Sequence, residues 1–213
     1  MYNIKIKEKK SWGLRKPKFS MNSTPNIPLM SAFVVNFIIY LFTVFDPSII
    51  YLLAIGGESP LGALTAYTFN FTHVGFIHFL FNMLALLVFA EQIQRRFYHK
   101  KWVQWFLYFV TPLIIGCIML LFNPPATVGY SGVVLAILTF GVVHKMTGYK
   151  SIALQLIGFH VLLMFLPLNV SLLAHGVGAV VGLSFAMILK YEKIWATKKY
   201  QKTRSWRERH GSD

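Results

Sequence analysis

The sequence predicts an all-α polytopic membrane protein, and three observations carry this prediction. The 213 residues are 55% hydrophobic and only 13% charged, whereas a soluble domain usually carries about 25% charged residues. The mean hydropathy is +0.55. The apolar residues gather into six stretches, most of which approach the length of about 20 residues that a membrane-spanning helix needs. These predicted spans are 29–55, 77–93, 102–122, 131–143, 152–167 and 172–189.

The basic residues predict how these spans are oriented. All 21 lysines and arginines lie in the N-terminal segment, the second-to-third connection, the fourth-to-fifth connection or the segment after the sixth span. The other three connections contain none. Basic residues favour the cytoplasmic side of a membrane, so both termini are predicted to be cytoplasmic. Retention on that side, with contacts to anionic headgroups, accounts for the net charge of +14. We therefore do not expect nucleic-acid binding.

This pattern divides the chain into three parts. Residues 1–28 form a basic cytoplasmic segment, residues 29–189 a six-helix membrane domain, and residues 190–213 a basic cytoplasmic tail. The first span follows lysines as a signal peptide would, but no small-residue cleavage site comes after it. It is therefore expected to be retained. The single cysteine, Cys117, excludes an intramolecular disulfide.

Two polar residues begin apolar spans on the same side of the predicted membrane. Ser131 opens the fourth span, and His175 lies near the start of the sixth. Each follows a connection that is free of basic residues and therefore faces outward. Polar groups are costly inside lipid and are kept mainly where they act. The pair indicates a serine nucleophile and a histidine base.

The short fourth span sets the depth of Ser131. From Ser131 to Lys145 is about 22 Å of helix, whereas the hydrocarbon core is about 30 Å thick. Ser131 should therefore lie below the outer surface, and the loop before it should dip inward. Such irregular backbone is tolerated only where it is buried in protein or lines water. A water-accessible site that opens outward is predicted.

Further residues fit the same site. His78 and Asn82 are four residues apart, so both project from one face of the second span. Their side chains could stabilise an oxyanion, together with the N–H groups at the start of the fourth span. Small residues let membrane helices pack closely, and a stripe of them should bring the sixth span against the fourth. The stripe comprises Ala174, Gly178, Gly182 and Ala186, facing Gly132 and Ala136.

These motifs resemble those of the rhomboid family of intramembrane serine proteases. They read His78-x-x-x-Asn82 on the second span, Gly129-Tyr130-Ser131-Gly132 at the fourth, and Ala174-His175-x-x-Gly178-x-x-x-Gly182 on the sixth. Thr72-His73, just before the second span, also fits the family. The resemblance covers the six-span core and implies a six-transmembrane-helix rhomboid-like bundle.

The resemblance also implies roles for these residues. Ser131 would be the nucleophile and His175 the general base, in a dyad without an acid. The oxyanion site would comprise His78, Asn82 and the Ser131 N–H. Gly129 would shape the turn, and no cofactor or metal is implied. Substrates would be membrane proteins cut in or near a transmembrane helix.

The sequence departs from the family pattern at three places. Leu135 stands where an aromatic residue usually supports the histidine ring, and Gln94 stands where the second span commonly ends with a glutamate. The first outer connection also lacks a Trp-Arg pair often found there.

Other functions remain as alternatives. The main one is a catalytically weak or silent rhomboid-like protein that binds transmembrane helices without cutting them. A transporter would need charged residues at mid-membrane, and a metalloprotease a motif such as His-Glu-x-x-His; both are disfavoured. His73 is expected to be structural, and His144 and His160 to be packing residues. The short termini and the lack of a seventh span suggest a bacterial plasma membrane. The oligomeric state is left open.

Overall fold

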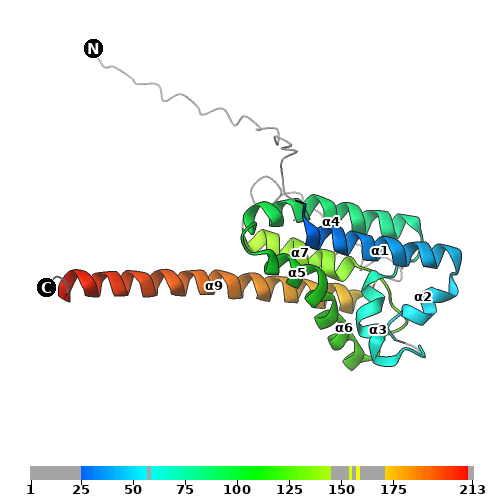
Figure 1. The fold of residues 1–213 in the computed structure, drawn as a ribbon. Helices are drawn as coiled ribbons and strands as arrows, with labels where there is room; N and C mark the ends of the chain where they lie inside the picture. The colour runs from blue at the N-terminus through cyan, green and yellow to red at the C-terminus, as the bar shows by residue number, and fades with distance from the viewer. Residues whose placement is uncertain (1–24, 57–58, 145–153, 155–156, 159–170, 211–213) are drawn as a thin grey trace, which may run out of the picture.

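The described part of the structure, a computed structural model, is a bundle of α-helices (Figure 1). It comprises residues 25–56, 59–144, 154, 157–158 and 171–210. Four of the helical segments there are long and apolar enough to cross a membrane: Ile27–Phe45, Phe76–Arg96, Lys101–Phe122 and Leu172–Trp195. The chain is therefore a multi-pass membrane protein. Most of the predicted fifth span, 152–167, lies outside the described residues.

The first predicted span is shorter than expected. The stretch 29–55 is predicted as one apolar span, and the structure divides it into α1 (Ile27–Phe45) and α2 (Ser48–Leu53). The break falls at Asp46 and Pro47. Proline disfavours a helical conformation in the residue before it, and the Asp46 carboxylate accepts hydrogen bonds from the Ser48 N–H (3.0 Å) and hydroxyl (2.7 Å). This local turn ends the span.

The connection between the first and second spans folds against the bundle. It consists of short turns, η1 (Gly62–Leu64), α3 (Thr65–Thr68) and η2 (Phe69–Phe71). The Asn70 side chain is fully buried and donates to the Pro112 carbonyl at 3.0 Å. This contact fixes the connection to the third span, just before α4 (Phe76–Arg96) begins.

The third span is helical throughout but not uniformly α-helical. It runs through α5 (Lys101–Trp105), a π-helical turn η3 (Phe106–Val110) and α6 (Thr111–Phe122). Pro112 lies at the start of α6 and has no N–H to offer the preceding turn. The irregular turn occurs where that donor is missing.

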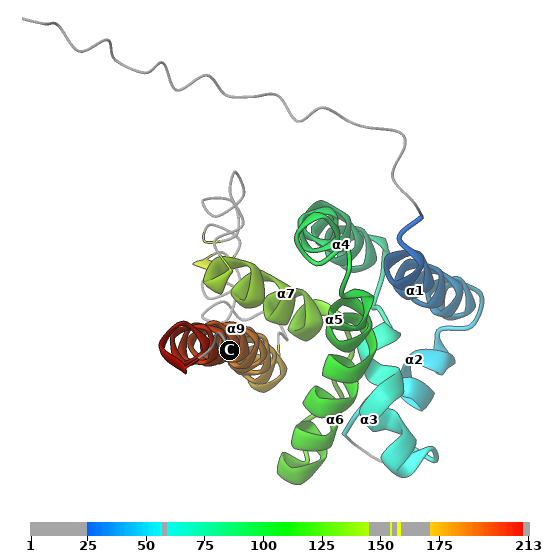
Figure 2. The same cartoon turned by 60° about the vertical axis from the view of Figure 1, so that its left-hand side comes forward.

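α7 (Ser131–Val143) is the central helix of the bundle. It lies between α4 and α9 (Leu172–His210) in Figure 2. An apolar helix that is buried on most sides fits the interior of a bundle, and nearly all of α7 from Gly132 to Phe140 is buried. Its bounds agree with the predicted fourth span.

α7 and α9 run parallel and touch backbone to backbone. A Cβ atom added at Gly178 would overlap the Gly132 carbonyl oxygen, and one added at Gly182 would overlap the Ala136 carbonyl oxygen. The Thr139 hydroxyl also donates to the Ala179 carbonyl at 3.1 Å. The predicted small-residue contact is thus present, and the shared direction is the one expected for a fourth and a sixth span.

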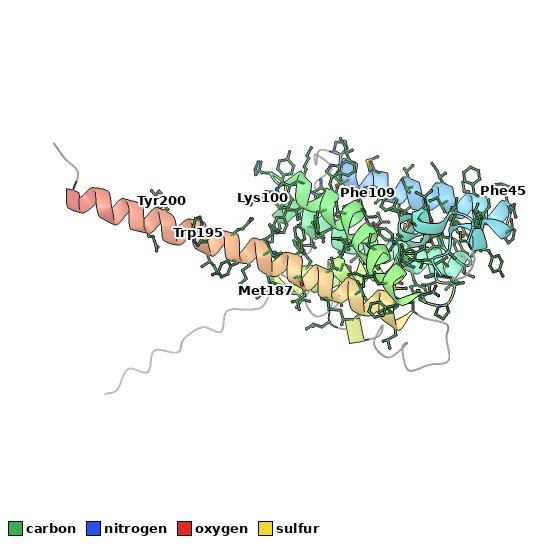
Figure 3. The ribbon with its side chains drawn as sticks, turned by 90° about the horizontal axis from the view of Figure 1, so that it is seen from below. Phe45, Lys100, Phe109, Met187, Trp195 and Tyr200 are labelled. Carbon is green, nitrogen blue, oxygen red and sulfur yellow. The ribbon has the colours of Figure 1, made fainter. Side chains whose placement is uncertain are left out.

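α9 continues well past the bundle. The predicted sixth span ends near Leu189, and the helix continues beyond it, with 39 residues in all, to His210. Trp195 and Tyr200 lie on this extension, which leaves the bundle at the end marked by Lys100, opposite Phe45 (Figure 3). The predicted boundary between residues 189 and 190 is therefore not a break in the helix.

Replacing Gly178 with alanine should lower the free energy of unfolding by about 1–3 kcal/mol, because the new methyl group must push α7 and α9 apart. Gly176→Ala is the matched control, since a Cβ at Gly176 meets nothing within 4 Å. Thermal unfolding of both variants in detergent measures the difference. Equal stabilities would contradict the close helix contact.

Candidate active site

The first turn of α7 and the first turn of α9 bring Ser131 and His175 together. The His175 Nε2 and the Ser131 Oγ are 2.6 Å apart. When Nε2 carries no proton, the serine hydroxyl donates to it. His175 is only 4% exposed, while Ser131 is partly exposed. This is the geometry of a nucleophile beside a general base.

Helix α9 is started by a serine one turn before His175. The Ala174 N–H donates to the Ser171 hydroxyl at 3.2 Å, and the His175 N–H donates to the Ser171 carbonyl at 3.1 Å. A serine in this position is a favoured N-cap. It fixes where the helix begins and therefore where His175 lies relative to α7.

The predicted oxyanion residue His78 lies against the turn that precedes Ser131. A Cβ atom added at Gly129 would be 2.7 Å from the His78 Cε1, 2.8 Å from its Nε2, and 3.7 Å from the Ser131 Oγ. Gly129 has a φ of +131°, which other residues rarely adopt. Glycine is therefore required at this position for two reasons: its backbone conformation, and the space that the His78 ring occupies.

Asn82 lies one turn further along α4 and is 5% exposed. Its side-chain amide donates to the His78 carbonyl at 2.9 Å. A side-chain amide has two N–H groups, so this bond leaves one for another acceptor. The hydrogen bond also ties together the two predicted oxyanion residues.

The other predicted residues lie as follows. Gly132, Gly178 and Gly182 form the α7–α9 contact described above. Leu135, one turn after Ser131, is 2% exposed and belongs to the core. Gln94 lies away from the site, near the end of α4, in a small recess that it shares with Asn26 and Gln104. Among the described residues no group of histidine, cysteine and acidic side chains could hold a metal ion.

Sequence reasoning missed the contacts that hold the turn before Ser131. Ile55 and Thr127 exchange two backbone hydrogen bonds of 3.0 and 2.9 Å, and the Gly129 N–H donates to the Phe69 carbonyl at 2.9 Å. The Tyr130 hydroxyl donates to the Tyr108 carbonyl at 2.8 Å. Only the bond from Tyr130 to Tyr108 could have been anticipated from the sequence, because Pro112 leaves the carbonyl four residues earlier without its α-helical donor.

His73 is buried beside this site, with its ring 5.1 Å from the His78 ring. Burial, and secondarily the neighbouring His78, lower the pKa of His73 to about 3. At the opposite end of α7, burial lowers the pKa of His144 to about 4, aided by the charges of Arg96, Lys190 and Lys193. Both side chains are therefore neutral near pH 7.

A comparison with protein families identifies the family of this chain. A model of the rhomboid domain matches residues 62–192, more than half of the chain. A search of curated proteins found no match. The matched range contains all three motifs and both members of the Ser131–His175 pair.

The pKa values predict that the protein loses stability as the pH falls. Between about pH 6.5 and pH 3, unfolded histidines bind protons that His73 and His144 in the folded state do not, so acidification favours unfolding. His73→Gln and His144→Gln should each flatten the dependence of the thermal midpoint on pH between 7 and 5. An unchanged slope in both variants would show that folding does not lower the pKa values of these rings.

Because the model of the rhomboid domain covers more than half of the chain, from residue 62 to residue 192, the protein belongs to the rhomboid family.

Proposed function

We propose that this chain is an intramembrane serine endopeptidase that hydrolyses peptide bonds in or near transmembrane helices of other membrane proteins. The observation that carries the proposal is the 2.6 Å contact between the Ser131 Oγ and the His175 Nε2. Family membership supports it but does not decide it, because rhomboid-like proteins without activity exist.

In the proposed reaction, the Ser131 oxygen attacks the carbonyl carbon of the scissile peptide bond as His175 accepts its proton. The resulting oxyanion would be stabilised by the His78 side chain, the Asn82 amide and the Ser131 N–H. When the intermediate collapses, the C–N bond breaks and His175 returns the proton to the leaving amine. Water then hydrolyses the acyl-enzyme, with His175 again acting as the base.

The peptide bonds of an intact helix embedded in lipid are accessible neither to water nor to Ser131. A substrate helix must unwind locally before a carbonyl carbon can reach Ser131, because a helix in lipid keeps its backbone groups paired. The partial exposure of Ser131 and His78 supports access from an aqueous side. We expect this to be the outer side of a bacterial plasma membrane, with the basic ends of the chain in the cytoplasm.

The first test is cleavage of a single-span model substrate by the purified protein in liposomes. Ser131→Ala and His175→Ala should each abolish cleavage, since each removes a group that the reaction needs. Ser48→Ala and His99→Ala are the matched controls, because both residues lie outside the site. Both variants should cleave the substrate at the wild-type rate. If wild type and Ser131→Ala bind the substrate helix equally and neither cuts it, the protein is a binding protein.

A second prediction separates the oxyanion residues from the dyad. His78→Ala and Asn82→Ala should lower kcat by about 10²–10³ without abolishing activity, as expected for the loss of one oxyanion donor. KM should change much less than kcat, because the oxyanion forms only in the reaction. Steady-state cleavage kinetics measure both constants. A change confined to KM would place these side chains in substrate binding instead.

A further inference from the structure

The Tyr108 carbonyl in the third span lacks the donor that a regular α-helix would give it. In a regular α-helix the Tyr108 carbonyl accepts a hydrogen bond from the N–H of residue 112, but residue 112 is proline and has none. The π-helical turn η3 begins two residues before Tyr108, and the Thr111 N–H bonds to Phe106, five residues back. Tyr108 is fully buried, so water cannot replace the missing donor.

The Tyr130 hydroxyl supplies the donor. It lies 2.8 Å from the Tyr108 carbonyl oxygen, and the Tyr130 side chain is fully buried. Its ring packs at 5.5 Å from the Phe71 ring, which belongs to the first outer connection. A buried carbonyl without a donor is costly, so the helix defect favours one fixed place for the phenol.

The same tyrosine begins α7. Tyr130 is the N-cap residue, and its carbonyl accepts the first backbone hydrogen bond of the helix, from Val134 at 3.0 Å. Its backbone therefore fixes where Ser131 starts, while its side chain is bonded to another span. The other bonds that join this turn to neighbouring segments, from Thr127 to Ile55 and from Gly129 to Phe69, involve backbone atoms only.

We infer that Tyr130 is a positioning residue: its hydroxyl, bonded to the carbonyl that Pro112 leaves free, holds the Ser131 hydroxyl in line with His175. This inference rests on the proposed function, because the position of Ser131 affects a rate only if Ser131 reacts. The acceptor of this bond is the carbonyl that the irregular turn of the third span leaves without its α-helical donor. The π-helical turn therefore helps to position Ser131 in the proposed active site, although the turn and Ser131 lie in different spans.

The test begins with Tyr130→Phe, which keeps the ring and removes the hydroxyl. We expect kcat for a model substrate to fall about tenfold, as for the loss of one buried hydrogen bond, with KM unchanged. Labelling of Ser131 by a fluorophosphonate should slow to a similar extent. Tyr67→Phe is the matched control, because the Tyr67 ring also contacts Phe71, at 5.1 Å, but lies outside this bond.

A double variant distinguishes an effect on the position of Ser131 from an effect on the stability of the protein. Pro112→Ala restores an N–H that can bond to the Tyr108 carbonyl, so Pro112→Ala/Tyr130→Phe should regain the thermal midpoint that Tyr130→Phe loses. Its kcat should stay low, because the phenol still does not hold the start of α7. If kcat recovers together with the midpoint, Tyr130 contributes stability alone and the inference is overturned.

The outcomes also distinguish this inference from the proposed function. If wild type cuts or is labelled at Ser131 and Tyr130→Phe matches the Tyr67→Phe control, the positioning role is overturned and the protease remains. If wild type is neither active nor labelled, both are overturned. A loss of kcat in Tyr130→Phe that persists in the double variant supports both.

Discussion

The distance between Ser131 and His175 depends on how closely two helix backbones can approach. The two residues lie on different helices, and a hydrogen bond of 2.6 Å leaves little tolerance. In a membrane the hydrophobic effect does not press helices together, so the separation is set by direct packing. Gly178 and Gly182 let α9 rest on carbonyl groups of α7. These glycines therefore determine the geometry of the proposed dyad as directly as its own side chains do.

The geometry of the site also depends on the depth and direction of the turn before Ser131. That turn is bonded to the chain after α2, to η2 and to the third span, through Thr127, Gly129 and Tyr130. A loop buried among helices must satisfy its backbone groups from its neighbours. The bonds that meet this requirement also fix the position of the loop, and with it the position of Ser131. The connection between the first and second spans therefore helps to support the site.

The sequence predicted the elements of the site better than the contacts between them. Ser131 and His175 could be paired because charge asymmetry placed both at one side, and the bounds of α7 followed from a short apolar run between a glycine-rich turn and basic residues. The break at Asp46 lies at an Asp-Pro pair inside one apolar stretch, and hydropathy alone does not reveal such a break. The bonds between Thr127 and Ile55 and between Gly129 and Phe69 involve backbone atoms, which every residue offers. Side-chain patterns therefore could not predict them.

One electrostatic consequence follows from the parallel arrangement of α7 and α9. Each helix begins near the site, so the positive ends of two helix dipoles converge on Ser131 and His175. This field favours an oxyanion and disfavours a positive charge on the histidine. In the proposed reaction the two charges appear in the same step a few ångströms apart, and their attraction is strong where water is scarce. A dyad can then work without a carboxylate, because the oxyanion itself is the counter-charge of the imidazolium.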